Sequence, residues 1–395
     1  PNRRMMKTPN VIRKIAAGTL ALLCAAGASY AANVSLNASD GVGTTSFNAA
    51  GHWNNSQAPS AANDYDTAGF FMRTPGDGVT NYVFAGNSLT LNVQNTSGGN
   101  NGSLLEKFSG GAGSVRWLTI NNLTNHDSAM IRSGGTAGAL IHIQGNHYTM
   151  LGNSSLLADQ CIWVIDSPLL GADNVIVTNN ANNANDHVAY SGTNSGFTGS
   201  WYLTASGTSA WSCELDSVYS LPGNPSSFNP GQITFLASGQ LRDIAGCALT
   251  NSNSGITLAA NGNINTSVTT LIGEPITDIT NGVHSLSSLT SSGAGTLILS
   301  NANNTYSGNT IISAGTLQLG LDNVIPSGAG AGDVTANSTL DLNGHNLTIN
   351  GLNGAGGVDT FAGGAATLTI GANGNNGNFT GNIANSAGTL SVVKI

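Results

Sequence analysis

The acidic residues are the first candidates for chemistry in this sequence. Asp64 with Asp66, and Glu214 with Asp216, are pairs separated by one residue, so each pair would share one face of a strand. Paired acids about 5–10 Å apart could hydrolyse a glycosidic bond, and clustered acids beside a base could support a Ca²⁺-assisted elimination. Lysine and arginine are almost absent near either pair in the sequence. We therefore interpret these acids as solvated turn residues and predict no catalytic residues.

Histidines are the second group that could do chemistry. His126, His142 and His147 lie near successive predicted strands, and Asp127 follows the first of them. A metal site would need three converging ligands and a supporting second shell. His142 lies between Ile141 and Ile143 and would point away from the face that they bury. We interpret these histidines as surface residues of a β-structure, and we predict no metal site and no cofactor.

The aromatic residues are few, and four of them cluster. Trp201, Tyr202, Trp211 and Tyr219 are candidate carbohydrate contacts, because a row of exposed aromatic rings would suit sugar stacking. Trp201 shares a strand face with Leu203 while Tyr202 lies on the opposite face, so one of the two adjacent aromatics is expected in the core.

Charge and cysteine content narrow the class of partner. All 19 acidic residues but only six of the 11 basic residues follow residue 31, so that part of the chain carries a formal net charge of −13. Nucleic acids and anionic membranes need clustered Lys and Arg, so neither is expected as a partner. The three cysteines in this part (Cys161, Cys213 and Cys247) allow one disulfide at most, and free buried thiols are equally consistent with the sequence.

The elements that must position these residues are short strands. Each predicted strand has four to six residues rich in Leu, Ile, Val and Thr, and most are bounded by Gly or Asn. The predicted strands are 88–92, 116–121, 140–144, 162–165, 174–178, 200–204, 232–236, 255–259, 296–300, 316–319, 339–342, 346–349 and 367–370. Beyond the first 31 residues no stretch shows a capped 3.6-residue apolar period, which indicates an all-β chain.

Internal spacing indicates that these strands stack in coils. Thr296 and Thr316 begin two similar strands, and the 20 residues between these starts are the length of one coil of a β-solenoid. An aromatic-Ser/Thr-Gly motif recurs at Tyr306-Ser-Gly308 and Phe379-Thr-Gly381, with a weaker copy at Phe197-Thr-Gly199. We expect the aromatic ring to pack at a coil corner and the Gly to permit the turn.

The repeats resemble a known family. Residues 290–395 contain Gly293-Ala-Gly-Thr-Leu-Ile-Leu-Ser300, then Asn304-Thr-Tyr-Ser-Gly308 and Ala314-Gly-Thr-Leu-Gln-Leu-Gly320, in that order. This order is similar to the autotransporter-associated β-strand repeat. The resemblance implies an elongated right-handed parallel β-helix (β-solenoid) in a large secreted or surface-displayed bacterial protein.

The sequence predicts four segments. Residues 1–31 have a basic start, a short apolar run and Ser29-Tyr-Ala31, the pattern of a signal peptide. Residues 32–87 are expected to cap the stack through Trp53 and Tyr65, residues 88–290 to form irregular coils, and residues 291–395 to form regular repeats. The natural start is expected at Met5 or Met6, and the final strand-like run predicts a continuation beyond Ile395.

Together these features predict a structural or adhesive passenger region without catalysis, exported through the periplasm and then secreted or held at the cell surface. Its expected partners are a surface glycan or a host or neighbour-cell protein, and the outer-membrane translocation machinery through a missing C-terminal region. The alternative is a β-helical polysaccharide-degrading enzyme or a carbohydrate-binding module.

The targeting segment gives a first testable prediction. Cleavage after Ala31 should leave exported protein that begins with Ala32-Asn33, because small residues occupy the −3 and −1 positions. N-terminal sequencing of exported material measures this directly. Exported protein that still carries Lys7 would contradict the prediction.

Overall fold

The computed structural model describes most of the chain after residue 30. The described ranges are 31–76, 81–92, 104–107, 113–127, 131–133, 138–158, 161–179, 186–192, 196–205, 213–215, 223–237 and 239–395. The chain divides into two units, Pro1–Ala31 and Ala32–Ile395, and the following account concerns the second unit. The predicted signal peptide lies outside the described residues except for Ala31.

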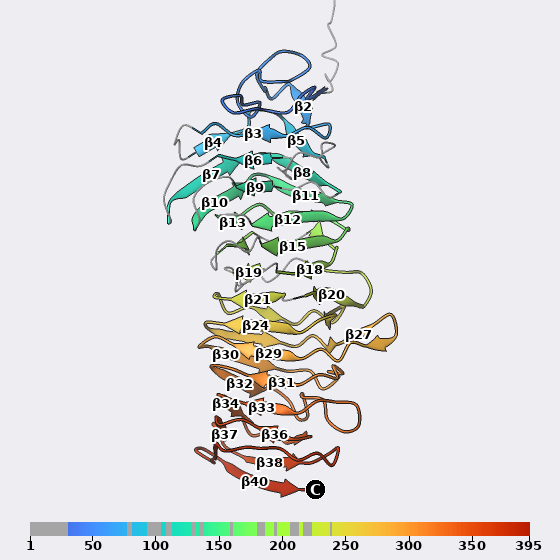
Figure 1. The fold of residues 1–395 in the computed structure, drawn as a ribbon, viewed down its shortest axis with the longest axis vertical. Helices are drawn as coiled ribbons and strands as arrows, with labels where there is room; N and C mark the ends of the chain where they lie inside the picture. The colour runs from blue at the N-terminus through green and yellow to red at the C-terminus, as the bar shows by residue number, and fades with distance from the viewer. Residues whose placement is uncertain are drawn as a thin grey trace, which may run out of the picture. The chain divides into compact units, whose positions relative to one another are not determined.

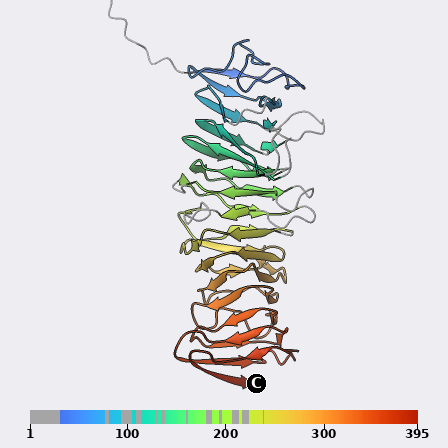
Figure 2. The same ribbon diagram turned by 90° about the vertical axis from the view of Figure 1, so that its left-hand side faces the viewer.

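The unit Ala32–Ile395 is an all-β parallel solenoid, as predicted (Figure 1). Its strands lie across the long axis, and successive coils are stacked from the N-terminal to the C-terminal end (Figure 2). Within the described residues no helix is both long and apolar enough to cross a membrane.

One sheet runs along almost the whole stack and contains 12 strands. In chain order they are β4 (Asn81–Val83), β7 (Val115–Thr119), β10 (Ala139–Gln144), β13 (Cys161–Ile165), β16 (His187–Tyr190), β19 (Cys213–Leu215), β21 (Gln240–Asp243), β24 (Gly262–Thr266), β29 (Leu289–Ser292), β31 (Thr310–Ile312), β33 (Val334–Ala336) and β36 (Leu352–Asn353).

Two seven-stranded sheets form a second side, one in each half of the chain. The first contains β1 (Ala32–Ser35), β2 (Asn63–Asp66), β5 (Ser88–Leu91), β8 (Asn122–His126), β11 (His147–Leu151), β14 (Leu169–Gly171) and β17 (Gly196–Phe197). The second contains β22 (Ala248–Leu249), β25 (Thr269–Ile272), β30 (Thr296–Leu299), β32 (Thr316–Leu319), β34 (Thr339–Asp341), β37 (Gly357–Asp359) and β39 (Asn382–Ile383).

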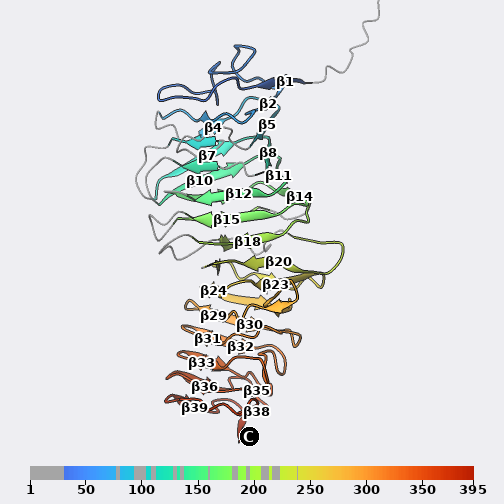
Figure 3. The ribbon, with the colours of Figure 1, turned by 45° about the vertical axis from the view of Figure 1, so that its right-hand side comes forward.

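Shorter sheets complete the coils (Figure 3). A six-stranded sheet contains β12 (Ser154–Ala158), β15 (Val175–Asn179), β18 (Trp201–Leu203), β20 (Asn229–Phe235), β23 (Ser254–Leu258) and β26 (Ile276–Thr277). Two three-stranded sheets contain β3 (Met72–Arg73), β6 (Leu104–Glu106) and β9 (Ile131–Ser133), and β35 (Leu347–Ile349), β38 (Ala365–Ile370) and β40 (Thr389–Lys394). The remaining pair, β27 (Ile279–Thr280) and β28 (Val283–His284), is antiparallel.

Every predicted strand overlaps an observed one, and the predicted register is confirmed. Thr296 pairs with Thr316 and Leu297 with Leu317, so the second strand lies directly on the first. Leu317 in turn pairs with Leu340, and Leu340 with Val358. All four apolar side chains of this column are fully buried. Each therefore contributes roughly 1.5–3 kcal/mol by leaving water.

Coil length varies on both sides of residue 290. In the 12-stranded sheet, Ala139 pairs with Cys161 and Cys213 with Leu241, which are 22 and 28 positions apart. Later coils are shorter but still uneven, since Val334 pairs with Leu352, 18 positions on. The strands keep their register because the extra residues lie at the corners.

The aromatic-Ser/Thr-Gly motif packs as predicted. Tyr306 and Phe197 are buried, and the Tyr306 hydroxyl lies 2.6 Å from Thr310 Oγ1. A Cβ on Gly199 would lie 2.7 Å from the Phe197 ring and 1.9 Å from the Asp173 carbonyl oxygen of the previous coil. Glycine is therefore required where the corner passes both the ring and the coil beneath it.

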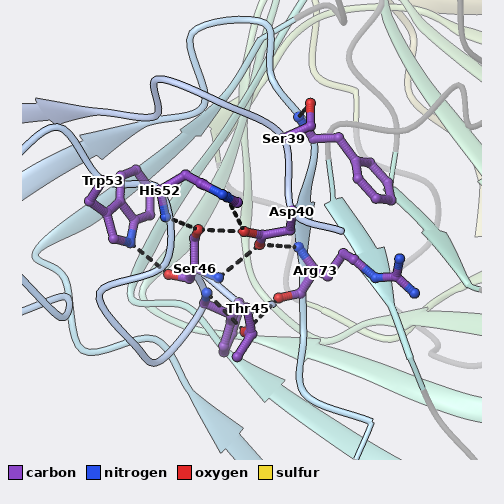
Figure 4. A network of polar contacts seen from close by, with 9 residues as sticks. Ser39, Asp40, Thr45, Ser46, His52, Trp53 and Arg73 are labelled. Carbon is purple, nitrogen blue, oxygen red and sulfur yellow. Dashed lines mark hydrogen bonds and ion pairs between the residues drawn. The ribbon is translucent and has the colours of Figure 1, made fainter. Parts of the chain in front are cut away.

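A polar network holds the first corner of the stack (Figure 4). The buried Asp40 carboxylate accepts hydrogen bonds from the Ser46 N–H and hydroxyl, both at 2.7 Å, and from the Arg73 N–H at 2.9 Å. His52 Nδ1 lies 3.1 Å from the same carboxylate, and Trp53 Nε1 donates to the Ser46 carbonyl at 2.7 Å. One carboxylate thus joins residues 33 positions apart.

Aromatic rings fill the space beneath this network. Trp53 packs edge-on against Tyr65 with ring centroids 4.7 Å apart, and Tyr65 packs against Phe84 at 5.3 Å. All three are buried. Strand β1 pairs in parallel with β2, and β2 pairs in parallel with β5, so coil stacking extends into the segment expected to cap the stack.

The Leu column gives a stability prediction. Leu317→Asp should cost several kcal/mol, because it places an unpaired carboxylate in a dry stack. Asn303→Asp, at an exposed corner, should change the free energy of unfolding by less than about 0.5 kcal/mol. Urea denaturation of both variants measures the difference, and equal midpoints would contradict the assigned register.

Candidate functional site

The structure places two of the four aromatic residues proposed as carbohydrate contacts, Trp201 and Tyr202, on opposite faces of β18. Trp201 is the core residue of its pair: it is fully buried, with ring centroids 5.6 Å from Phe197 and 6.4 Å from Tyr190. It has no exposed surface for a ligand. Tyr202 lies on the opposite face of β18 and is half-buried. Trp211 and Tyr219 lie outside the described residues.

The interpretation of the acids as solvated turn residues is wrong for Glu214. This side chain is buried, forms an ion pair with Arg242 and lies 3.3 Å from His187 Nε2. Burial raises the pKa of Glu214, but the hydrogen bonds and charges of His187 and Arg242 outweigh it, and the net shift is downward. The sequence search missed Arg242 because it is 28 positions away yet pairs with Glu214 on the next coil.

The first acidic pair has a similar role between coils. Asp64 accepts hydrogen bonds from Asn87 Nδ2 at 2.7 Å and from the Ser88 hydroxyl at 2.6 Å. Asp66 accepts a hydrogen bond from Asn92 Nδ2 at 2.5 Å. These carboxylates join one coil to the next, and their contacts are with neutral groups.

The three histidines make separate contacts. His142 stacks on Trp117 with centroids 3.9 Å apart, and its Nδ1 lies 2.7 Å from Asp166. His126 pairs with the adjacent Asp127 at 2.8 Å, and both are exposed. His147 lies on β11 and is half-buried. Among the described residues, no three His, Cys, Asp or Glu side chains are grouped as metal ligands would be.

Sequence reasoning missed a lateral groove of about 730 Å³, a volume within the range of ligand sites. Its lining comes from corners of successive coils and includes Phe228 and, from the β27–β28 hairpin, Ile279. The lining residues are Phe228, Pro230, Thr250, Asn251, Ser252, Gly273, Pro275, Thr277, Ile279, Asn301, Asn303 and Thr305.

The hairpin projects sideways from the stack (Figure 1). Asn281 and Gly282 form its two-residue turn with φ values of 52° and 79°, which is a type I′ geometry. Ile279 and Val283 on its strands are 43% and 68% exposed. The Asn-Gly signal was present in the sequence, but the flanking strands are only two residues long.

A buried carboxylate anchors the hairpin base. Asp278 accepts hydrogen bonds from the Ser307 hydroxyl and the Ser287 N–H, and His284 Nδ1 lies 2.5 Å from it. Burial raises the pKa of Asp278, but the bonds from Ser307 and His284 make the net shift downward. A second hollow, of about 660 Å³, also has the hairpin residues Ile279 and His284 in its lining and shares Ile279 and Thr305 with the groove.

The groove floor shows an asparagine ladder with one exception. Residues Asn251, Glu274 and Asn301 occupy equivalent positions on three successive coils, as the pairing of Leu249 with Ile272 and Ile272 with Leu299 shows. Asn251 Nδ2 and Asn301 Nδ2 each donate to a carbonyl of the preceding coil.

Glu274 departs from this ladder because its side chain is buried. It is 5% exposed, and its Oε2 has no hydrogen-bond partner in the structure. Burial raises its pKa to about 7, and a hydrogen bond from the Asn251 backbone offsets only part of that effect. Glu274 lies in the corner between β25 and β26, and its neighbours Gly273 and Pro275 line the groove while its own buried side chain does not, so it points beneath the floor.

Comparison with known proteins identifies one segment. Residues 289–319 match the family model of the passenger-associated-transport-repeat. The matched residues span β29 to β32, which include the confirmed 20-residue coil. The resemblance to autotransporter passenger repeats is thereby confirmed for this segment of a β-solenoid. No curated protein and no solved structure matches the chain.

Glu274 gives a pH-dependent prediction. Because its folded pKa is about 7 against an ordinary value of 4.5, the folded chain binds the proton more tightly. Its contribution to stability is therefore fully present below about pH 4.5 and is lost as the pH rises through 7. Glu274→Gln should remove this loss and stabilise the protein at pH 8 by roughly 3 kcal/mol.

Urea midpoints at pH 4.5 and pH 8 measure the effect. Glu214→Gln is the matched control with the opposite sign, because the pKa of Glu214 is lowered. It should destabilise the protein at pH 8, and a further series of midpoints below pH 4.5 should show the difference shrinking as the pH falls. Parallel pH profiles for wild type and Glu274→Gln would show that the carboxyl is not buried as described.

Proposed function

We propose that this chain is a structural or adhesive passenger region that a bacterium exports and exposes at its surface. The observation that carries the proposal is the passenger-associated repeat at residues 289–319 within one parallel stack of coils. A stack with a continuous core can extend by adding coils, and its corners accept insertions without breaking the sheets. This architecture suits a stalk that presents binding loops.

The proposed partners follow from this role. The passenger repeat supports association with outer-membrane translocation machinery through a region outside this chain. A surface glycan or a protein of a host or neighbouring cell is the proposed adhesive target. Tyr202 remains a candidate carbohydrate contact because it lies on the outer face of its strand.

The alternative of a polysaccharide-degrading enzyme has less support. Glycoside hydrolysis needs an acid with a raised pKa that faces the substrate. Glu274 has the raised pKa, but it points beneath the groove, and its neighbours Gly273 and Pro275 line the floor instead. Glu214 is paired with Arg242, which lowers its pKa.

Surface exposure and adhesion are tested separately on intact cells. An antibody raised against the full chain should label unpermeabilised cells of the native bacterium, and externally added protease should remove the label. Beads coated with the purified exported chain should bind host or neighbouring cells more than beads coated with the Leu317→Asp variant. Label that appears only after permeabilisation would contradict the passenger role.

A further inference from the structure

We infer that the groove between Phe228 and the β27–β28 hairpin binds a neutral glycan chain lying along the stack axis. This inference rests on the proposed function and specifies the ligand class for it. The groove is large enough for a ligand, at about 730 Å³, and its lining residues come from four separate stretches between positions 228 and 305.

The charge of the lining selects the ligand class. All 12 lining residues are uncharged. A phosphorylated or uronic-acid ligand would find no cation there, and the surplus of acidic over basic residues in the chain after residue 31 would repel it. A basic peptide would find no carboxylate in the groove, because Glu274 and Asp278 beside it are buried. This lining can therefore bind a neutral ligand without burying an unpaired charge.

The mixture of apolar rings and small polar groups favours a sugar. Phe228 is 54% exposed and offers a flat apolar surface against which the C–H face of a pyranose ring can pack. Ser252, Asn303 and Thr305 are exposed and supply hydroxyl and amide groups, which both donate and accept hydrogen bonds. Sugar hydroxyls need partners of that kind.

The repetition of the floor favours a polymer. Successive coils are about 4.8 Å apart, so the equivalent residues Asn251 and Asn301, two coils apart, lie roughly 10 Å from each other. A ligand along the axis thus meets Asn251 and Asn301 on either side of the Gly273 and Pro275 corner. A chain of similar sugar units can use such a row, whereas a single small molecule would use one coil only.

An extended peptide is less well matched to this floor. The Gly273 N–H donates to the Leu249 carbonyl at 2.7 Å, and the Gly273 carbonyl accepts from Asn301 Nδ2 at 2.8 Å. The backbone groups of the middle corner are therefore used within the stack. A peptide strand that binds through main-chain hydrogen bonds would therefore find no free backbone partner at the Gly273 corner.

The test measures binding of the purified full chain to immobilised polysaccharides by affinity electrophoresis. The panel contains a neutral glucan, mannan and galactan, an anionic polyuronate and unfolded casein as an extended peptide. We expect at least one neutral polymer to retard the protein and the polyuronate to have no effect. Phe228→Ala should weaken the binding about tenfold, the loss of one aromatic contact.

Two matched controls accompany the groove variants. Phe361 is 52% exposed and lies outside the groove, so Phe361→Ala should bind as the wild type does. Asn303→Ala should weaken binding several-fold, whereas Asn376→Ala, at another exposed corner, should not. Unchanged urea midpoints for all four variants would show that folding is intact.

The inference is overturned if no neutral polymer binds, if the polyuronate binds instead, or if the two Phe variants lose binding equally. Casein binding that depends on Phe228 would identify a peptide groove and also overturn it. Each of these results leaves antibody labelling of intact cells unaffected. Failure of the glycan inference is therefore distinguishable from failure of the passenger role.

Discussion

The hydrogen-bonded stacking of each coil on the next is the constraint on which the rest of this structure depends. Parallel strands hold the coils about 4.8 Å apart, so whatever occupies one position must tolerate an equivalent residue directly above and below. The column Leu297, Leu317, Leu340 and Val358 satisfies this by apolar contact. At some corners the coils are so close that a Cβ would clash with the coil beneath. Glycine is required there, as at Gly199, which faces the Asp173 carbonyl.

Several buried carboxylates are held in the stack by neighbouring residues that complete their bonding, whereas Glu274 Oε2 is an exception. Asp243 is fully buried, and its carboxylate accepts hydrogen bonds from three consecutive N–H groups, Ala245 to Cys247, and from the Thr270 hydroxyl on the next coil. Glu106 and Arg116 form a buried ion pair at 2.6 Å. Leaving such a group unpaired costs more free energy than its pairing contributes. These groups therefore specify the register of the coils more than they stabilise the fold.

This constraint also explains how much could be predicted from sequence. Strand positions and the Thr296–Thr316 register follow from local alternation and a 20-residue spacing, both of which are visible in the sequence. Contacts between corners are not visible, because the distance along the chain between paired residues varies from 18 positions (Val334 to Leu352) to 36 (Asn81 to Trp117) and hides which residues stack. The Glu214–Arg242 ion pair and the groove are both assembled from different coils, so neither has a local motif.

The groove shows how binding chemistry can be added to such a stack. The β27–β28 hairpin is inserted between β26 and β29, yet Gly262 still pairs with Leu289 and Leu289 with Thr310. Asp278 bonds to Ser287 and Ser307, which precede the paired strands β29 and β31 on successive coils, and so fixes the insertion at its base. The sheets keep their hydrogen bonds while the hairpin exposes Ile279 and Val283 on its strands, and Ile279 lines two hollows. Because the stability comes from the strands and the variation from the corners, a corner can change its ligand without changing the fold.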